Sequence, residues 1–123
     1  LSHISFVRAC KVVERTGNIL KGVKEKINDH VEPSLFQDTL ERHLFDLFNK
    51  EEQTIRKLVG EKKYGAAVKL YGDVFYQPVH DFFDRVMVNT EDAKIRTNRQ
   101  ALVKRINLLC TANVADLSYV TNL

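Results

Sequence analysis

Basic side chains at helical spacing are the residues of this sequence best suited to chemistry, and the chemistry would be binding to a polyanion. Arg8, Lys11 and Arg15 recur at intervals of three and four residues, which places them on one face of a helix. A second basic group lies away from the apolar positions of the last segment and consists of Arg96, Lys104 and Arg105. Such groups meet the phosphates of nucleic acids. Both groups are therefore candidate RNA contacts.

Aromatic residues near the middle of the chain could add base stacking. Tyr71, Phe75 and Tyr76 come shortly before Pro78, in a segment that we interpret as a loop. Unstacked RNA bases are read by stacking on aromatic rings or guanidinium planes. Tyr71 and Tyr76 are therefore further candidate RNA contacts. A loop folded back onto the core is the alternative interpretation, since aromatic side chains are usually buried.

The sequence offers only weak evidence for a catalytic, metal-binding or phosphate-binding site. His80 and Asp84 are four residues apart, but a metal site needs a third ligand and none is nearby. Cys10 and Cys110 form no Cys-x-x-Cys pair, so we expect both thiols to be reduced and buried. The glycines are isolated and form no phosphate-binding loop. We therefore predict no catalytic residue, metal or cofactor in this segment.

Apolar residues recur at helical intervals throughout, which predicts an all-α bundle of about five helices. The first helix spans residues 4–21, and Gly17 on its apolar stripe would let a neighbouring helix approach closely. Pro33 and Ser34 open the second helix, where Ser34 and Gln37 form a capping box. That helix ends at Gly60.

Two breaks divide the second half of the chain. A short helix over residues 62–70 ends at Gly72 and Asp73, and a fourth helix begins at Pro78, which suits a first turn. Asn89 or Thr90 caps the last helix, whose apolar stripe consists of Ile95, Leu102, Ile106 and Leu109. Arg99 falls on that stripe and needs a carboxylate partner, because an unpaired buried charge is costly. Asp84 is the first choice, as a structural ion pair, and Asp92 the second.

Composition sets the remaining limits. The 123 residues suffice for one domain, residues 1–123, with a net charge of +3. The positive charge gathers toward the two ends of the chain, so end helices packed side by side would merge it into one patch. No apolar run approaches the roughly 18 residues of a membrane span. Because the sequence starts at Leu1, we expect a fragment of a longer protein.

The order of several short motifs resembles one family over about residues 12 to 118. The strongest run is Pro78-Val79-x-x-Phe82-Phe83-Asp84-x-Val86-Met87-Val88, followed by Ile95-Arg96-x-Asn98-Arg99 and Ala115-Asp116-Leu117. Arg15-x-x-Asn18-Ile19-Leu20-Lys21 and Glu41-x-x-Leu44 add to it. These motifs resemble the C-terminal, helical anticodon-binding domain of the DALR type in the glycyl-tRNA synthetase beta subunit. Departures from the family pattern occur at Asn89, Gln100 and Val103.

The resemblance implies a tRNA-binding piece of a cytoplasmic ligase. The full enzyme would join two alpha and two beta subunits and use ATP and Mg to attach glycine to its tRNA. This fragment would grip the anticodon arm and position the tRNA, with no bond-making of its own. Its partners would be glycine tRNA and the alpha subunit, with neither DNA nor membrane. The alternatives are a helical subunit-interaction module, or a DALR domain from another aminoacyl-tRNA synthetase.

Overall fold

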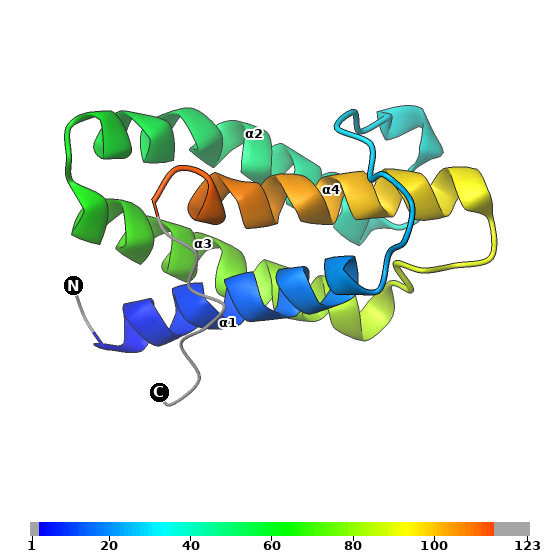
Figure 1. Ribbon diagram of the computed structural model, residues 1–123, viewed down its shortest axis with the longest axis horizontal. Helices are drawn as coiled ribbons and strands as arrows, with labels where there is room; N and C mark the ends of the chain where they lie inside the picture. The colour runs from blue at the N-terminus through cyan, green and yellow to red at the C-terminus, as the bar shows by residue number, and fades with distance from the viewer. Residues whose placement is uncertain (1–2, 115–123) are drawn as a thin grey trace.

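The computed structural model describes residues 3–114 and shows four α-helices within them (Figure 1). The helices are α1 (His3–Lys21), α2 (Thr39–Gly60), α3 (Tyr64–Arg85) and α4 (Ala93–Thr111), with a single 3-10 turn, η1 (Pro33–Leu35). The all-helical class is confirmed for this part of the chain. The Ala115-Asp116-Leu117 motif lies outside the described residues. None of the four α-helices is long and apolar enough to cross a membrane.

The predicted number of about five helices was too high, because residues 64–85 form one continuous helix. Gly72 and Asp73 do not end a helix, and Pro78 lies inside α3, not in a first turn. A proline within a helix removes one backbone hydrogen bond and usually breaks it. Here the packing of Phe75, Val79 and Phe82 in the core, each no more than 1% exposed, holds α3 together on both sides of Pro78.

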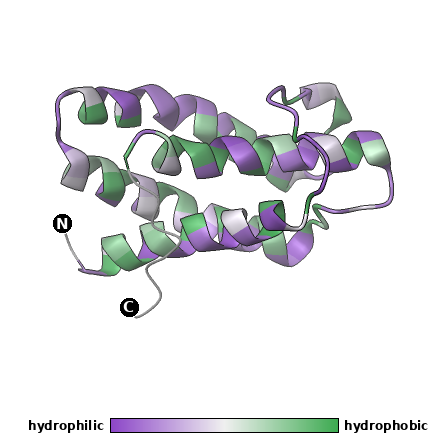
Figure 2. Cartoon of the chain, viewed as in Figure 1, coloured by the Kyte–Doolittle hydropathy of each residue, from purple (hydrophilic) through white to green (hydrophobic). Residues whose placement is uncertain are grey.

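The four helices form a bundle in which α1 and α2 occupy opposite corners. α1 packs against α3 and α4, and α2 packs against the same two helices. α1 and α3 run in one direction, and α2 and α4 run in the other (Figure 1). The core lies between them, while the outward side of α2 is largely hydrophilic (Figure 2). The predicted stripe of α4 is confirmed, since Ile95, Leu102, Ile106 and Leu109 are all buried.

Helices α1 and α3 approach each other closely at Gly72. A Cβ atom at Gly72 would lie 2.4 Å from the backbone oxygen of Ser5 and 2.7 Å from the backbone nitrogen of Ala9. Gly17 was predicted to serve this purpose, and that prediction was wrong. A Cβ there would meet only the Asn107 side chain, at the ordinary distance of 3.6 Å. Gly72 therefore sets the separation of α1 and α3.

Helix α2 begins later than its sequence indicated. Pro33 and Ser34 form the η1 turn, and Phe36 then adopts an extended backbone that ends it. The capping box is made by Asp38 and Glu41 instead of Ser34 and Gln37. The Glu41 carboxylate accepts hydrogen bonds from the backbone of Gln37 and Asp38, each at 3.1 Å. Glu41 is thus held at the first turn of α2 although it is fully buried.

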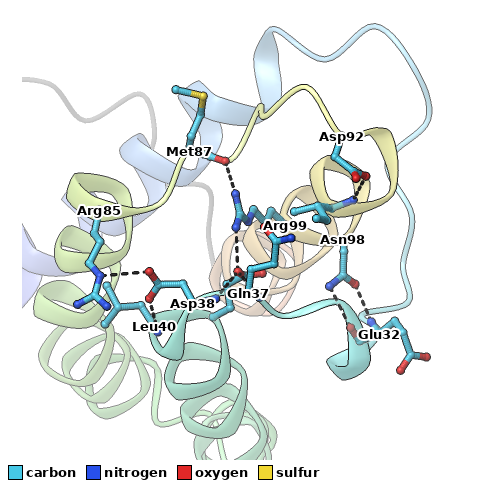
Figure 3. A network of polar contacts seen from close by, with 11 residues as sticks. Glu32, Gln37, Asp38, Leu40, Arg85, Met87, Asp92, Asn98 and Arg99 are labelled. Atoms are coloured by element: carbon cyan, nitrogen blue, oxygen red, sulfur yellow. Dashed lines mark hydrogen bonds and ion pairs between the residues drawn. The ribbon is translucent and has the colours of Figure 1, made fainter.

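Arg99 is buried as predicted, but its partner is not Asp84 or Asp92. Its guanidinium donates to Glu41 Oε1 at 3.0 Å and to the Met87 carbonyl at 2.8 Å (Figure 3). Asp84 lies on the exposed side of α3, and Asp92 caps α4 by accepting from the backbone of Lys94 and Ile95. The predicted cap residues, Asn89 and Thr90, therefore do not cap α4. The buried pair joins α2, α4 and the segment after α3.

The connection between α1 and α2 is fastened to α4. The Asn98 side chain exchanges two hydrogen bonds with the backbone of Glu32, at 2.6 and 3.0 Å (Figure 3). Lys104 pairs with the Asp29 carboxylate at 2.6 Å, and Arg105 donates to the Asp29 carbonyl at 3.0 Å. The connection is thus held along α4 by side chains of that helix.

Candidate nucleic-acid interface

A row of two guanidinium groups and three rings runs along the outer edge of α1 and α3. We call it the stacking row, and its members are Arg8, Tyr76, His80, Arg15 and Phe83. The Arg8 guanidinium carbon lies 5.8 Å from the centre of the Tyr76 ring. The Tyr76 and His80 rings are stacked, with centres 6.5 Å apart and planes 12° apart. Arg15 donates to His80 Nδ1 and lies 5.4 Å from the centre of the Phe83 ring.

Helical spacing and helix direction together produce this row. Tyr76, His80 and Phe83 are four and three residues apart, so one face of α3 carries all three rings. Arg8 and Arg15 are seven residues apart, which is about two turns of α1. Because α1 and α3 run in the same direction and approach closely at Gly72, each arginine stays level with a ring.

Two carboxylates orient the arginines of the stacking row. Asp73 accepts from Arg8 at 3.3 Å, from Lys69 at 2.9 Å and from Ser5 at 2.9 Å. The Lys69 hydrogen bond is the largest of several causes that hold the pKa of the Asp73 carboxyl below its usual range. Arg8 and the neighbouring Lys11 remain close to half exposed at their side chains, so phosphates can reach both.

His80 links Arg15 to the second carboxylate. A guanidinium can only donate, so His80 Nδ1 accepts the hydrogen bond from Arg15, and the ring proton belongs on Nε2. That nitrogen lies 3.1 Å from Asp84, which is also 3.9 Å from Arg15. The Arg15 guanidinium is therefore fixed in place by His80, Asp84 and Phe83 before any ligand arrives.

An open groove of about 650 Å³ begins where the stacking row ends. Its lining comes from three segments and includes Arg15, Asn18, Ile19, Phe83, Asp84 and Met87. Arg15 and Phe83 belong to both the groove and the row. Flat rings and guanidinium planes beside a groove can hold an unstacked nucleobase. Exposed basic side chains next to them can contact the phosphates of the RNA backbone.

The structure separates the predicted RNA contacts into distinct groups. Arg8, Arg15 and Tyr76 come together in the stacking row, and Lys11 stands exposed on the same helix. Tyr71 does not join them, because it is 1% exposed and its hydroxyl donates to the Ile106 carbonyl at 2.7 Å. A ring buried in this way cannot stack on a base, so the prediction for Tyr71 was wrong.

The basic residues of α4 lie apart from the stacking row. Arg96 donates to the carbonyls of Thr90 and Glu91, while Lys104 and Arg105 hold the α1–α2 connection. Among the contacts between α1 and α4, the Asn107 side chain donates to the Val13 carbonyl and to the Thr16 hydroxyl. The polar partners of Arg96, Lys104 and Arg105 are therefore different from those of the stacking row, and an RNA role for these three residues stays a prediction.

Sequence reasoning missed two members of the stacking row, His80 and Phe83. Their signal was the spacing of positions 76, 80 and 83, which share one face of a helix. That signal disappears when Pro78 is interpreted as the start of a helix, because Tyr76 then falls in a loop. Among residues 3–114, no group of three or more metal-ligating side chains is present. Cys10 and Cys110 are buried and outside any disulfide, as predicted, and burial raises the pKa of Cys10.

Comparison with known proteins identifies the family. The family described as the DALR anticodon binding domain matches residues 9–112. The glycine–tRNA ligase beta subunit of Pseudomonas fluorescens is 36% identical over 107 residues, which are 87% of this chain and 15% of that protein. The corresponding subunit of Psychromonas ingrahamii is 38% identical over 105 residues, 85% of this chain and 15% of that protein. That of Desulforudis audaxviator is 33% identical over 117 residues, 95% of this chain and 16% of that protein.

The chain thus spans about 15% of the length of these relatives, and within it the family match covers α2, α3, α4 and α1 from Ala9 onward. The helical fold agrees with the match. This chain belongs to the DALR anticodon-binding domain family and is homologous to a segment of glycine–tRNA ligase beta subunits.

Proposed function

We propose that this chain binds the anticodon arm of a glycine tRNA through the α1–α3 edge. The observation that carries the proposal is the stacking row, in which two arginines contact three rings. Proteins bind RNA loops by stacking the nucleobases on such groups, while neighbouring basic side chains contact the phosphates. Arg8 and Lys11 supply the phosphate contacts, and Arg15 with Phe83 supplies a stacking surface beside the groove.

Within a complete ligase, this domain would act by positioning. The relatives are named glycine–tRNA ligase beta subunits, so the reaction of the whole protein would be attachment of glycine to tRNA with ATP and Mg. A grip on the anticodon arm would place the distant acceptor end and reduce the entropy lost in reaching the transition state. The partners would be glycine tRNA and an alpha subunit, in the cytoplasm.

A titration of the 123-residue chain with two tRNAs at two salt concentrations tests this proposal. We expect tighter binding to glycine tRNA than to a non-cognate tRNA, and weaker binding to both at higher salt. The double variant Arg8→Ala/Lys11→Ala should lower the salt dependence by about one to two phosphate contacts. Both side chains are exposed, so the variant should fold normally.

A charge-matched control separates this site from general attraction. Lys50 and Lys57 are exposed on α2, away from the stacking row, so Lys50→Ala/Lys57→Ala removes equal charge elsewhere. An equal loss of affinity in both double variants would reduce the site to non-specific attraction. No binding to either tRNA would overturn the proposal and favour a docking module, which a pull-down with the alpha subunit would then detect.

A further inference from the structure

We infer that the groove beside Arg15 receives one unstacked base of the anticodon, and that Met87 is the side chain against which this base packs. The inference rests on the proposed function and adds to it a contact residue with no charge. Met87 is not part of the stacking row and was not among the RNA contacts predicted from the sequence. Its role is argued from its exposure, its anchoring and the chemistry of the groove.

The Met87 side chain is exposed because of the backbone conformation around it. It is 71% exposed, whereas its neighbours Val86 and Val88 are 6% and 3% exposed. The backbone at Val86 is extended, and side chains alternate between two sides along extended chain. Burial of the two valines therefore turns Met87 outward, where a large apolar side chain stands over the groove.

The backbone of Met87 is fixed from inside the protein. Its carbonyl accepts a hydrogen bond of 2.8 Å from Arg99, whose guanidinium is paired with the buried Glu41. Figure 3 shows the Met87 side chain pointing away from this network while its carbonyl points into it. An exposed apolar group held in this way binds without first losing backbone freedom, which favours affinity.

The groove has the chemistry of a nucleobase site. Ile19, Phe83 and Met87 offer apolar surface for the flat face of a base, and Asn18 is an exposed amide at the rim that can pair with a polar base edge. Asp84 also lies at the rim and would repel a phosphate. The base therefore enters the groove, while the phosphates stay over the basic residues of α1.

A binding cycle with paired protein and RNA changes tests this inference. The protein variants are Met87→Ala, Met87→Leu and the control Leu108→Ala, which shortens an exposed apolar side chain in a different depression on α4. The RNA probes are a tRNA transcript with a glycine anticodon and three copies of it, each with one abasic anticodon position. Removing a base in this way keeps every phosphate.

Met87→Ala should weaken binding to the intact transcript roughly fivefold or more, the low end for loss of one base contact. The slope of affinity against salt should stay unchanged, because no phosphate contact is lost. Met87→Leu should retain most of the affinity. On the one abasic transcript that lacks the contacted base, Met87→Ala should cause no further loss, since the two changes remove the same interaction.

Distinct outcomes separate this inference from the proposed function. If Met87→Ala and Leu108→Ala bind the intact transcript equally well, the base site at Met87 is overturned while RNA binding stands. If Met87→Ala weakens all three abasic transcripts as much as the intact one, the contact is not to an anticodon base, and the inference fails. If the unaltered chain binds no transcript, the proposed function itself fails, and the groove is left to a protein partner.

Discussion

Replacing Gly72 with alanine should destabilise the bundle, although alanine is the better helix former. The new Cβ would lie 2.4 Å and 2.7 Å from two backbone atoms of α1, and ordinary contact begins at 3.4 Å. The helices must therefore separate by about 1 Å, and neither atom belongs to a side chain that could rotate away. Overpacking of this kind costs up to ~3 kcal/mol, and the better helix propensity of alanine returns ~1 kcal/mol. We expect a net loss of ~2 kcal/mol.

Gly17→Ala is the matched control for this prediction. It also adds a methyl group inside a helix, but the new Cβ lies 3.6 Å from a side-chain nitrogen and needs no movement. It should stabilise the protein by up to ~1 kcal/mol. Urea denaturation followed by circular dichroism measures both variants. The reasoning is refuted if Gly72→Ala proves as stable as Gly17→Ala, because the close approach would then carry no energetic weight.

Three further predictions concern other parts of the molecule. Arg99→Met should cost ~3–5 kcal/mol in urea denaturation, because the buried Glu41 carboxylate would lose the cation paired with it; a loss near zero would contradict this. Tyr71→Phe should cost ~1 kcal/mol for the lost hydrogen bond yet leave tRNA affinity unchanged, and reduced affinity would restore Tyr71 as an RNA contact. The pKa of Asp73 is lowered chiefly by Lys69, so its stabilising effect is complete above the ordinary value of 3.8 and disappears as pH falls through the lowered value. The stability difference between the unaltered chain and Asp73→Asn should therefore shrink below that pH, and a constant difference would count against the assignment.

Local patterns in the sequence correctly predicted which positions within one helix are buried. The buried stripe of α4 and the burial of Arg99 follow from spacing within one helix, and both were correct. The partner of Arg99 could not be predicted, because Glu41 is 58 residues away and its burial depends on how α2 and α4 meet. Asp84 was chosen because it belongs to the Phe82-Phe83-Asp84 motif, but α3 turns it toward the solvent.

The candidate interface along α1 and α3 was only half predictable for a similar reason. Arg8, Lys11 and Arg15 share a face that the sequence displays directly. The rings opposite them became visible only once α3 was known to continue through Pro78. Intrinsic preference argued for a break at that proline, and burial of the residues on either side overrode it. Tertiary packing thus decided which residues stand together at the site.

The fastening of the α1–α2 connection to α4 has a consequence for biosynthesis. Chains emerge from the ribosome from the N-terminus, so α1, the connection and α2 are made before α4. Asn98, Lys104 and Arg99 all belong to α4, and they anchor Glu32, Asp29 and Glu41 respectively. Until α4 has emerged, the Glu41 carboxylate has no cation to accompany it into the core and must stay hydrated. The first half of this domain therefore cannot complete its core before α4 has been synthesised. A nascent chain halted before α4 would remain on the ribosome with an incomplete core.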